Sequence, residues 1–205
     1  MTDAPDMLDL TSAAHRMERI LTGIDDAQLS APTPCSDASV GVLVDHVLGL
    51  SLAFTAAARK EYGPDTDSPP ELAGEPPPDW RLLVPGRMAA LGEAWTDPTA
   101  WTGTARAGGL DLPAAVAGLV ALDELVVHGW DLALATGQDY SCEPHEIAAC
   151  TAFAESITDE ERARDANGLF GPAVRVGDEA PPLDRLIGLT GRDPSWTPPT
   201  LRTGG

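Results

Sequence analysis

Residues 113–136 limit the possible folds of this chain more than any other segment does. Apolar side chains occur on every side of a helix drawn through them, with Pro113 at its start and Gly137 just past its end. A helix that is apolar almost all round has no face for water, so other elements have to enclose it. The sequence therefore predicts a central, buried helix with further helices packed around it.

Other segments show the apolar spacing, or the start and stop signals, of helices. We expect these further helices at about residues 6–21, 36–59, 79–95 and 144–156, with a short one near 183–189. The 79–95 helix is expected to be interrupted at Pro85 and Gly86. Apolar residues make up 43% of the chain and are mostly Ala, Leu and Val, of which Ala and Leu favour helices. The predicted fold class is all-α.

The segments between the helices are rich in Pro, Gly and acidic residues. Residues 62–78 predict a long exposed loop, and residues 104–112 predict a short extended piece or hairpin. After the last long helix the pattern becomes irregular. We therefore expect a helical bundle over 1–158, an irregular extension packed on it over 159–195, and a disordered tail over 196–205.

Charge and composition argue against several classes of partner. The chain has 32 acidic and 13 basic residues, a net charge of −19, so its surface repels nucleic-acid backbones and anionic membranes. No run of about 18 apolar residues predicts a membrane span, and the acidic N-terminus does not resemble a secretion signal. The three cysteines show no disulfide spacing. We expect a soluble, cytoplasmic protein without nucleic-acid or membrane partners, and leave a homodimer open.

Two polar residues interrupt the central apolar helix. A buried carboxylate at Glu124 needs a compensating positive charge, since its burial alone costs several kcal/mol. His128 follows four residues later, which places both side chains on one face, one helical turn apart. A cation can be held between them. Asp131, three residues further on, is a candidate to hydrogen-bond a ligand from outside the site.

A third ligand has to come from a facing helix, and His46 is the natural candidate. It lies in the middle of the 36–59 helix on a mostly apolar surface. Two His and one Glu suit Zn²⁺, with a fourth position left for water or substrate; Ni²⁺ and Fe²⁺ accept the same donors. A plain alternative stays open, because a single buried His is often a hydrogen-bonded core residue and a Glu-x-x-x-His pair is often a simple ion pair.

The cysteines are weaker candidates. Cys35 precedes a predicted helix start, which lowers a thiol pKa, so either a redox or a structural role fits it. Cys142, His145 and Cys150 match no metal-binding spacing.

Three stretches together resemble a known family. They are TPCSDASVGVLVDHVLG (33–49), LDELVVHGWDLALATGQ (122–138) and FGPAVRVGDEAPPLDRLIGLTGRDPSW (170–196). The first two resemble the DinB-like, mycothiol-dependent maleylpyruvate isomerase N-terminal family, and the third resembles its actinobacterial metal-binding subgroup. The resemblance implies an up-down four-helix bundle. It also implies metal ligands at His46, Glu124 and His128, the three residues that burial and spacing single out.

The resemblance further implies a chemistry. A thiol, mycothiol in this family, would take the open metal position as thiolate and add to an electrophilic substrate, giving cis–trans isomerisation or S-transfer. An Arg is expected to recognise a substrate carboxylate. Two features depart from the family: Ala38 stands where it has Trp, and the residues after 158 are too few for the separate C-terminal domain of the isomerase.

Two other functions remain as alternatives. The first is a non-catalytic metal-binding protein with a stress or regulatory role and no thiol substrate. The second is metal-assisted hydrolysis, which needs a free general base beside the metal. Asp131 is the only candidate for that base, because Glu124 is taken as a ligand.

Overall fold

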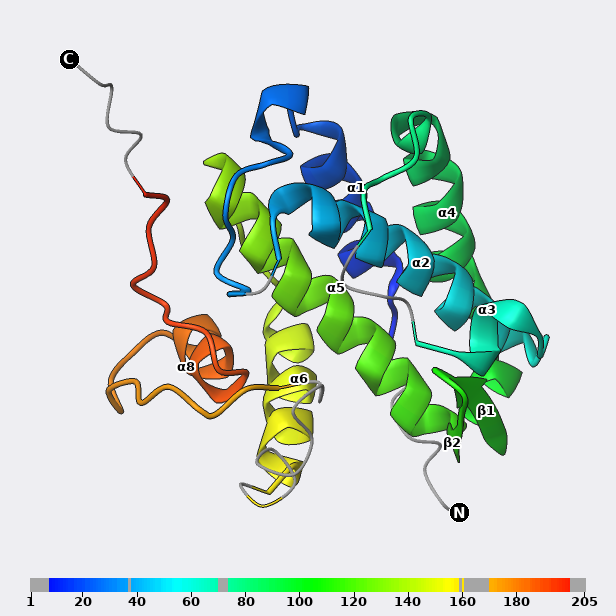
Figure 1. Cartoon of the computed structure of the whole chain (residues 1–205). Coiled ribbons are helices and arrows are strands. Elements are labelled where there is room, and N and C mark those ends of the chain that lie inside the picture. The colour runs from blue at the N-terminus through cyan, green and yellow to red at the C-terminus, as the bar shows by residue number, and fades with distance from the viewer. Residues whose placement is uncertain (1–7, 37, 70–73, 159, 161–169, 200–205) are drawn as a thin grey trace.

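The computed structural model of the chain describes residues 8–36, 38–69, 74–158, 160 and 170–199 (Figure 1). Within these residues the structure is mostly helical, which confirms the all-α prediction. The long helices are α1 (Thr11–Thr22), α2 (Val40–Arg59), α4 (Trp80–Ala94), α5 (Ala114–Thr136) and α6 (Pro144–Ser156), followed by the shorter α8 (Pro182–Leu189).

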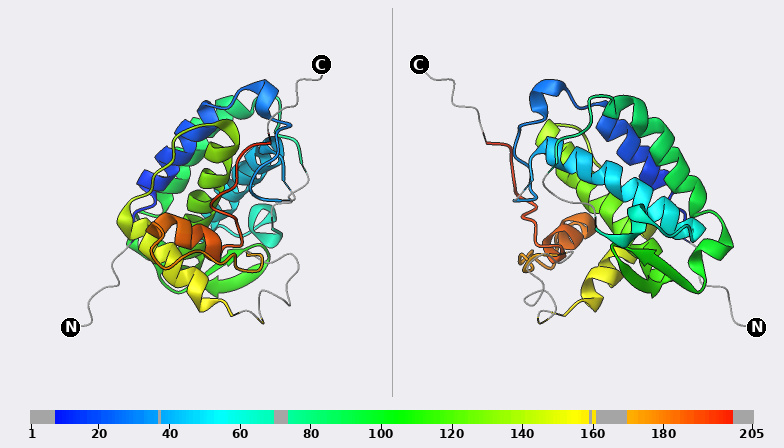
Figure 2. Two further views of the ribbon diagram at one scale, coloured as in Figure 1. Left: turned by 90° about the vertical axis from the view of Figure 1, so that its left-hand side faces the viewer. Right: turned by 45° about the vertical axis from the view of Figure 1, so that its right-hand side comes forward.

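Four of these helices form the bundle. α1 packs against α4 and α5, and α2 packs against the same two helices, so the four enclose one apolar core. Helix α5 is buried along most of its length, as the sequence predicts. Helix α6 covers the outer side of α5, and α8 packs against α6 (Figures 1 and 2).

Helix α2 has the composition of a core helix. Among the described residues it is the one helix long and apolar enough to cross a membrane by length and composition. However, 67% of its apolar window is buried inside the structure, as is usual for the core helix of a soluble protein.

The predicted interruption of the 79–95 helix is wrong, because α4 continues through Pro85. Pro85 and Gly86 both lie on the exposed side of the helix. The opposite side buries Trp80, Val84 and Met88 against the bundle. Packing of this face holds the helix together, although a proline removes one backbone hydrogen bond from it.

The loop predicted at 62–78 is partly ordered by the hairpin beside it. It contains a short helix, α3 (Pro64–Asp67), whose Thr66 is fully buried and accepts a backbone hydrogen bond from Gly109 at 2.7 Å. Residues 70–73 lie outside the described part. The predicted hairpin is confirmed: β1 (Thr104–Ala107) pairs antiparallel with β2 (Leu110–Pro113).

The C-terminal segment returns to the bundle after α6. Its helix α8 packs on α6, and the backbone of Val174 donates to Gly188 at 2.9 Å. Trp196, at the start of the predicted tail, is partly buried against the core. Most of 159–169 and all of 200–205 lie outside the described residues.

Candidate metal centre

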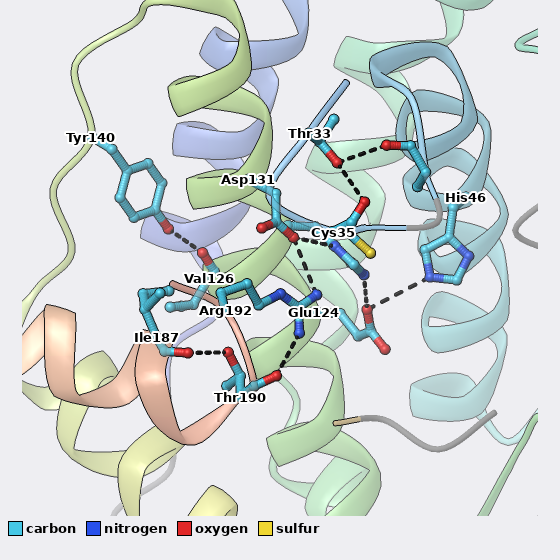
Figure 3. Close-up of polar contacts among 12 residues, drawn as sticks. Thr33, Cys35, His46, Glu124, Val126, Asp131, Tyr140, Ile187, Thr190 and Arg192 are labelled. Atoms are coloured by element: carbon cyan, nitrogen blue, oxygen red, sulfur yellow. Dashed lines mark hydrogen bonds and ion pairs between the residues drawn. The ribbon is translucent and has the colours of Figure 1, made fainter. Parts of the chain in front are cut away.

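The three predicted ligands meet between α2 and α5. His46, Glu124 and His128 each offer one ligand atom, and these atoms lie within 4.8 Å of one another. The Glu124 Oε2 atom is 3.0 Å from His128 Nε2 and 3.7 Å from His46 Nε2 (Figure 3). No other cluster of this kind occurs among the described residues.

Local structure explains why these side chains converge. The apolar pattern of α2 packs it against α5, and His46 lies on the buried side of α2. On α5 the four-residue spacing stacks Glu124 and His128 on the side that faces α2. The two imidazoles meet edge to face, with ring centroids 5.2 Å apart. The site is nearly closed to water, since even the Glu124 side chain is only 14% exposed.

Glu124 and His128 on α5 form a pair in which the imidazole can supply the positive charge that the buried carboxylate needs. Burial would raise the pKa of Glu124, but the hydrogen bond from His128 and the positive charge of that imidazole hold it well below its usual range. Burial likewise opposes a charged His128, but its hydrogen bonds to Asp131 and Glu124 raise its pKa to about 9. An imidazolium at His128 thus supplies the cation that Glu124 needs. Burial of Glu124 does not by itself require a metal ion.

His46 is different, because its hydrogen-bonding capacity is not used. Its buried Nδ1 atom has no partner among the described residues, and its Nε2 atom lies too far from Glu124 for a good hydrogen bond. A buried polar nitrogen left in this way costs about 1–3 kcal/mol. The His46 nitrogen that faces Glu124 is Nε2, so a ligand role would use Nε2, an atom that the Glu124–His128 ion pair leaves without a good hydrogen bond.

Asp131 lies behind His128, on the side away from Glu124. It is fully buried, and its Oδ2 atom is 3.1 Å from His128 Nδ1. The same oxygen accepts a hydrogen bond from Arg192 Nη2 at 3.2 Å. The Oδ1 atom of Asp131 is another buried atom without a partner in the described part of the chain.

Arg192 and Asp123 are the polar residues near the site that sequence reasoning missed. Twelve arginines gave no basis for choosing one, and Arg192 reaches the site from beyond α8. Asp123 is buried on α5 next to Glu124. Burial, reinforced by the charge of Glu124, raises the pKa of Asp123 to about 8, so it is largely neutral at pH 7. The adjacent acids in the apolar segment were the signal that could have revealed it.

None of the three cysteines belongs to the ligand trio, although Cys35 lies close to it, beside Arg192 (Figure 3). Cys35 is in the loop before α2, where its carbonyl accepts a hydrogen bond from Thr33 at 3.0 Å (Figure 3). Cys142 and Cys150 are free thiols on the α6 side of α5, and burial raises the pKa of each. His145 is exposed and joins no cluster with them in the described residues.

Comparison with known proteins gives matches along most of the chain. A sequence model of the mycothiol maleylpyruvate isomerase N-terminal domain matches residues 10–133. Two uncharacterized proteins, from two strains of Mycobacterium tuberculosis, are each 28% identical over 185 residues, covering 84% of this chain and 90% of the relative. A crystal structure of a histidine-to-alanine variant of the mycothiol-dependent maleylpyruvate isomerase shares the fold, with a TM-score of 0.53 and 19% identity. That alignment covers 82% of this chain and 75% of the isomerase chain.

Proposed function

Because the chain belongs to the mycothiol maleylpyruvate isomerase N-terminal domain family, we propose that it binds a divalent metal ion through His46, Glu124 and His128 to activate a small thiol. The observation that supports this most is the convergence of three ligand atoms from two helices, all within 4.8 Å of one another. The proposed compartment is the cytoplasm.

The donor set suits Zn²⁺ best. Two imidazoles and one carboxylate leave one position of a tetrahedral site for another ligand. Ni²⁺ and Fe²⁺ take the same donors, so the native metal is a matter for measurement. The chemistry that such an ion supplies when bound is deprotonation of a coordinated thiol at neutral pH.

The protein's own groups prepare the site. Asp131 accepts the hydrogen of His128 Nδ1, which leaves the Nε2 lone pair for a metal ion once the Nε2 proton is lost. Burial of the trio keeps water away from the ligand atoms and strengthens every charge interaction among them.

For the substrates we propose mycothiol and an electrophilic alkene. The thiol sulfur would form a C–S bond to the alkene while the proton from the thiol passes to solvent. If the C–S bond breaks again after rotation about the former double bond, the outcome is cis–trans isomerisation. If that bond persists and the neighbouring carbanion takes up a proton, the outcome is S-transfer.

The position of Asp131 argues against metal-assisted hydrolysis. A general base has to reach a water molecule on the open side of the metal. Asp131 lies on the far edge of the His128 ring and is fully buried between that ring and Arg192. A non-catalytic metal-binding protein therefore remains the main alternative.

Metal analysis of the purified protein tests the site. We expect wild type to hold one ion per chain and a His46→Ala variant to hold none. His15→Ala is the matched control, since His15 is exposed on α1, and it should bind metal as wild type does. Equal metal content in wild type and His46→Ala would refute the proposed centre.

Thiol binding separates an enzyme from an inert metal binder. We expect mycothiol, added to the Co²⁺-loaded protein, to produce a sulfur-to-cobalt charge-transfer band and a change in the visible spectrum. His46→Ala that has been treated with Co²⁺ and mycothiol in the same way should show neither. If the wild-type spectrum does not change at saturating thiol, the non-catalytic alternative is correct.

A further inference from the structure

We propose that Arg192 is a positioning residue for the metal centre, which holds Asp131 and thereby sets the orientation of His128. The inference rests on the proposed function, because it assigns a residue to the same site. The family match ends at residue 133, so Arg192 lies outside the matched region.

Four side chains contact one another in sequence, in the order Arg192, Asp131, His128 and Glu124. The Asp131 Oδ2 atom receives Arg192 Nη2 at 3.2 Å and faces His128 Nδ1 at 3.1 Å. At the opposite edge of the imidazole, His128 Nε2 is 3.0 Å from Glu124 Oε2. One carboxylate oxygen of Asp131 contacts both Arg192 and His128, so we expect a shift of the guanidinium to move the imidazole; Figure 3 shows Arg192 beside Asp131.

Burial strengthens the interaction between Arg192 and Asp131. Asp131 is 0% exposed and Arg192 is 9% exposed, so solvent does little to screen their charges. Without the guanidinium, the His128 imidazole would be the one charged partner of the Asp131 carboxylate among the described residues. The carboxylate would then be free to change its rotamer, and the ring with it.

The chain holds Arg192 firmly where it is needed. Gly191, at a φ of +86°, turns the backbone at the end of α8, where a Cβ atom would come within 3.0 Å of Gly171. The Arg192 backbone N–H donates to Ile187 at 3.1 Å, and its Nη1 atom donates to the Thr190 carbonyl at 3.0 Å. The guanidinium is thus fixed by its own turn before it meets Asp131.

These contacts also argue that Arg192 does not bind substrate. Both terminal nitrogens donate to groups of the protein, and the Nε atom is buried without a partner among the described residues. The guanidinium faces the interior of the fold. Its effect on chemistry therefore passes through Asp131, and docking of the C-terminal segment becomes a condition for a well-formed metal site.

A double-mutant cycle on metal affinity tests the inference. We expect Arg192→Gln to weaken Zn²⁺ binding about 10–100-fold, the usual range for loss of an outer partner of a ligand. In an Asp131→Asn background the same change should cost less than about 3-fold, because the connection is already broken. Arg185→Gln is the control, since Arg185 is exposed on α8, and it should leave the affinity unchanged.

Two further readouts exclude a purely structural effect. The ¹⁵N chemical shifts of the His128 ring, measured without metal, should change in Arg192→Gln and be partly restored in Arg192→Lys. Unfolding by urea identifies the folded fraction of each variant. If Arg192→Gln does not fold, Arg192→Lys replaces it in the double-mutant cycle. The expected loss of Zn²⁺ affinity in Arg192→Lys is below about 10-fold.

The outcomes are distinct. If wild type binds no metal, the proposed function and this inference fail together. If wild type binds metal and Arg192→Gln binds it equally well, the inference alone is overturned. It is also overturned if the loss is the same in both Asp131 backgrounds, because Arg192 then does not act through Asp131.

Discussion

Two buried polar clusters in the described part of the chain differ in how completely their hydrogen bonds are made. In the first, between α1 and α6, Glu146 accepts hydrogen bonds from Ser12 at 2.6 Å, from Arg16, and from the Glu143 backbone at 2.9 Å. In the second, between α2 and α5, His46 Nδ1 and Asp131 Oδ1 are buried without partners in the described residues.

The difference in hydrogen bonding between the two clusters indicates which of them is a candidate functional site. Both clusters bury charge, so burial of charge does not separate them. Glu146 uses both carboxylate oxygens within the protein, and the cluster ties α6 to α1. The α2–α5 cluster brings three possible ligand atoms within 4.8 Å of one another, and His46 Nε2 makes no good hydrogen bond there, which is the arrangement that a site for an added ligand requires.

Arg16→Met should have the largest effect on stability. It leaves the fully buried Glu146 carboxylate without its cation, which typically costs about 3–5 kcal/mol in the free energy of unfolding. Urea unfolding measures this, with the exposed Arg19→Met on the same helix as control. Zn²⁺ affinity of the folded fraction should be unchanged. A loss below about 1 kcal/mol would show that the first cluster is not structural.

Adding metal should stabilise the wild-type protein by the next largest amount. An ion that binds only the folded state at 100 times its Kd contributes about 2.7 kcal/mol. Thermal unfolding with and without Zn²⁺ measures the shift. Arg19→Met should show the same shift and His46→Ala none. A shift that persists in His46→Ala would place metal binding elsewhere.

His46→Leu sharpens the comparison because it should separate stability from binding. It replaces an imidazole with an unsatisfied nitrogen by an apolar side chain of similar size. We therefore expect the free energy of unfolding of the metal-free protein to change by less than about 1 kcal/mol, in either direction. Metal binding should be lost. A large destabilisation would indicate a structural His46, comparable to Arg16.

The smallest effect concerns the thiols beside the first cluster. Burial raises the pKa of Cys142 and of Cys150 above the usual 9.0. The folded state therefore keeps protons that the unfolded chain loses above about pH 9, so this contribution to stability is full below that pH and is lost as pH rises. Iodoacetamide at pH 8, followed by mass spectrometry, should leave both thiols unmodified until urea is added. Fast labelling of the native protein would contradict this.

Part of the fold and site follows from short-range patterns. The apolar periodicity of residues 113–136 predicts a buried helix, and α5 occupies Ala114–Thr136. The four-residue spacing places Glu124 and His128 in contact, as observed. Pro85 was misread because a local rule for helix breaking ignores the packing of α4 on the bundle.

The amino-acid pattern alone predicts that α5 is central, that Glu124 and His128 share one face, and that His46 is the candidate third ligand. These conclusions depend on periods of a few residues or on a motif. Only the tertiary structure decided that His128 can neutralise Glu124, that His46 keeps a nitrogen free, and that Arg192 joins Asp131 across 61 residues of chain. The physical reason is the sequence distance over which each interaction acts. Helical periodicity involves neighbouring residues, whereas hydrogen-bond satisfaction and charge pairing depend on which distant segments pack together.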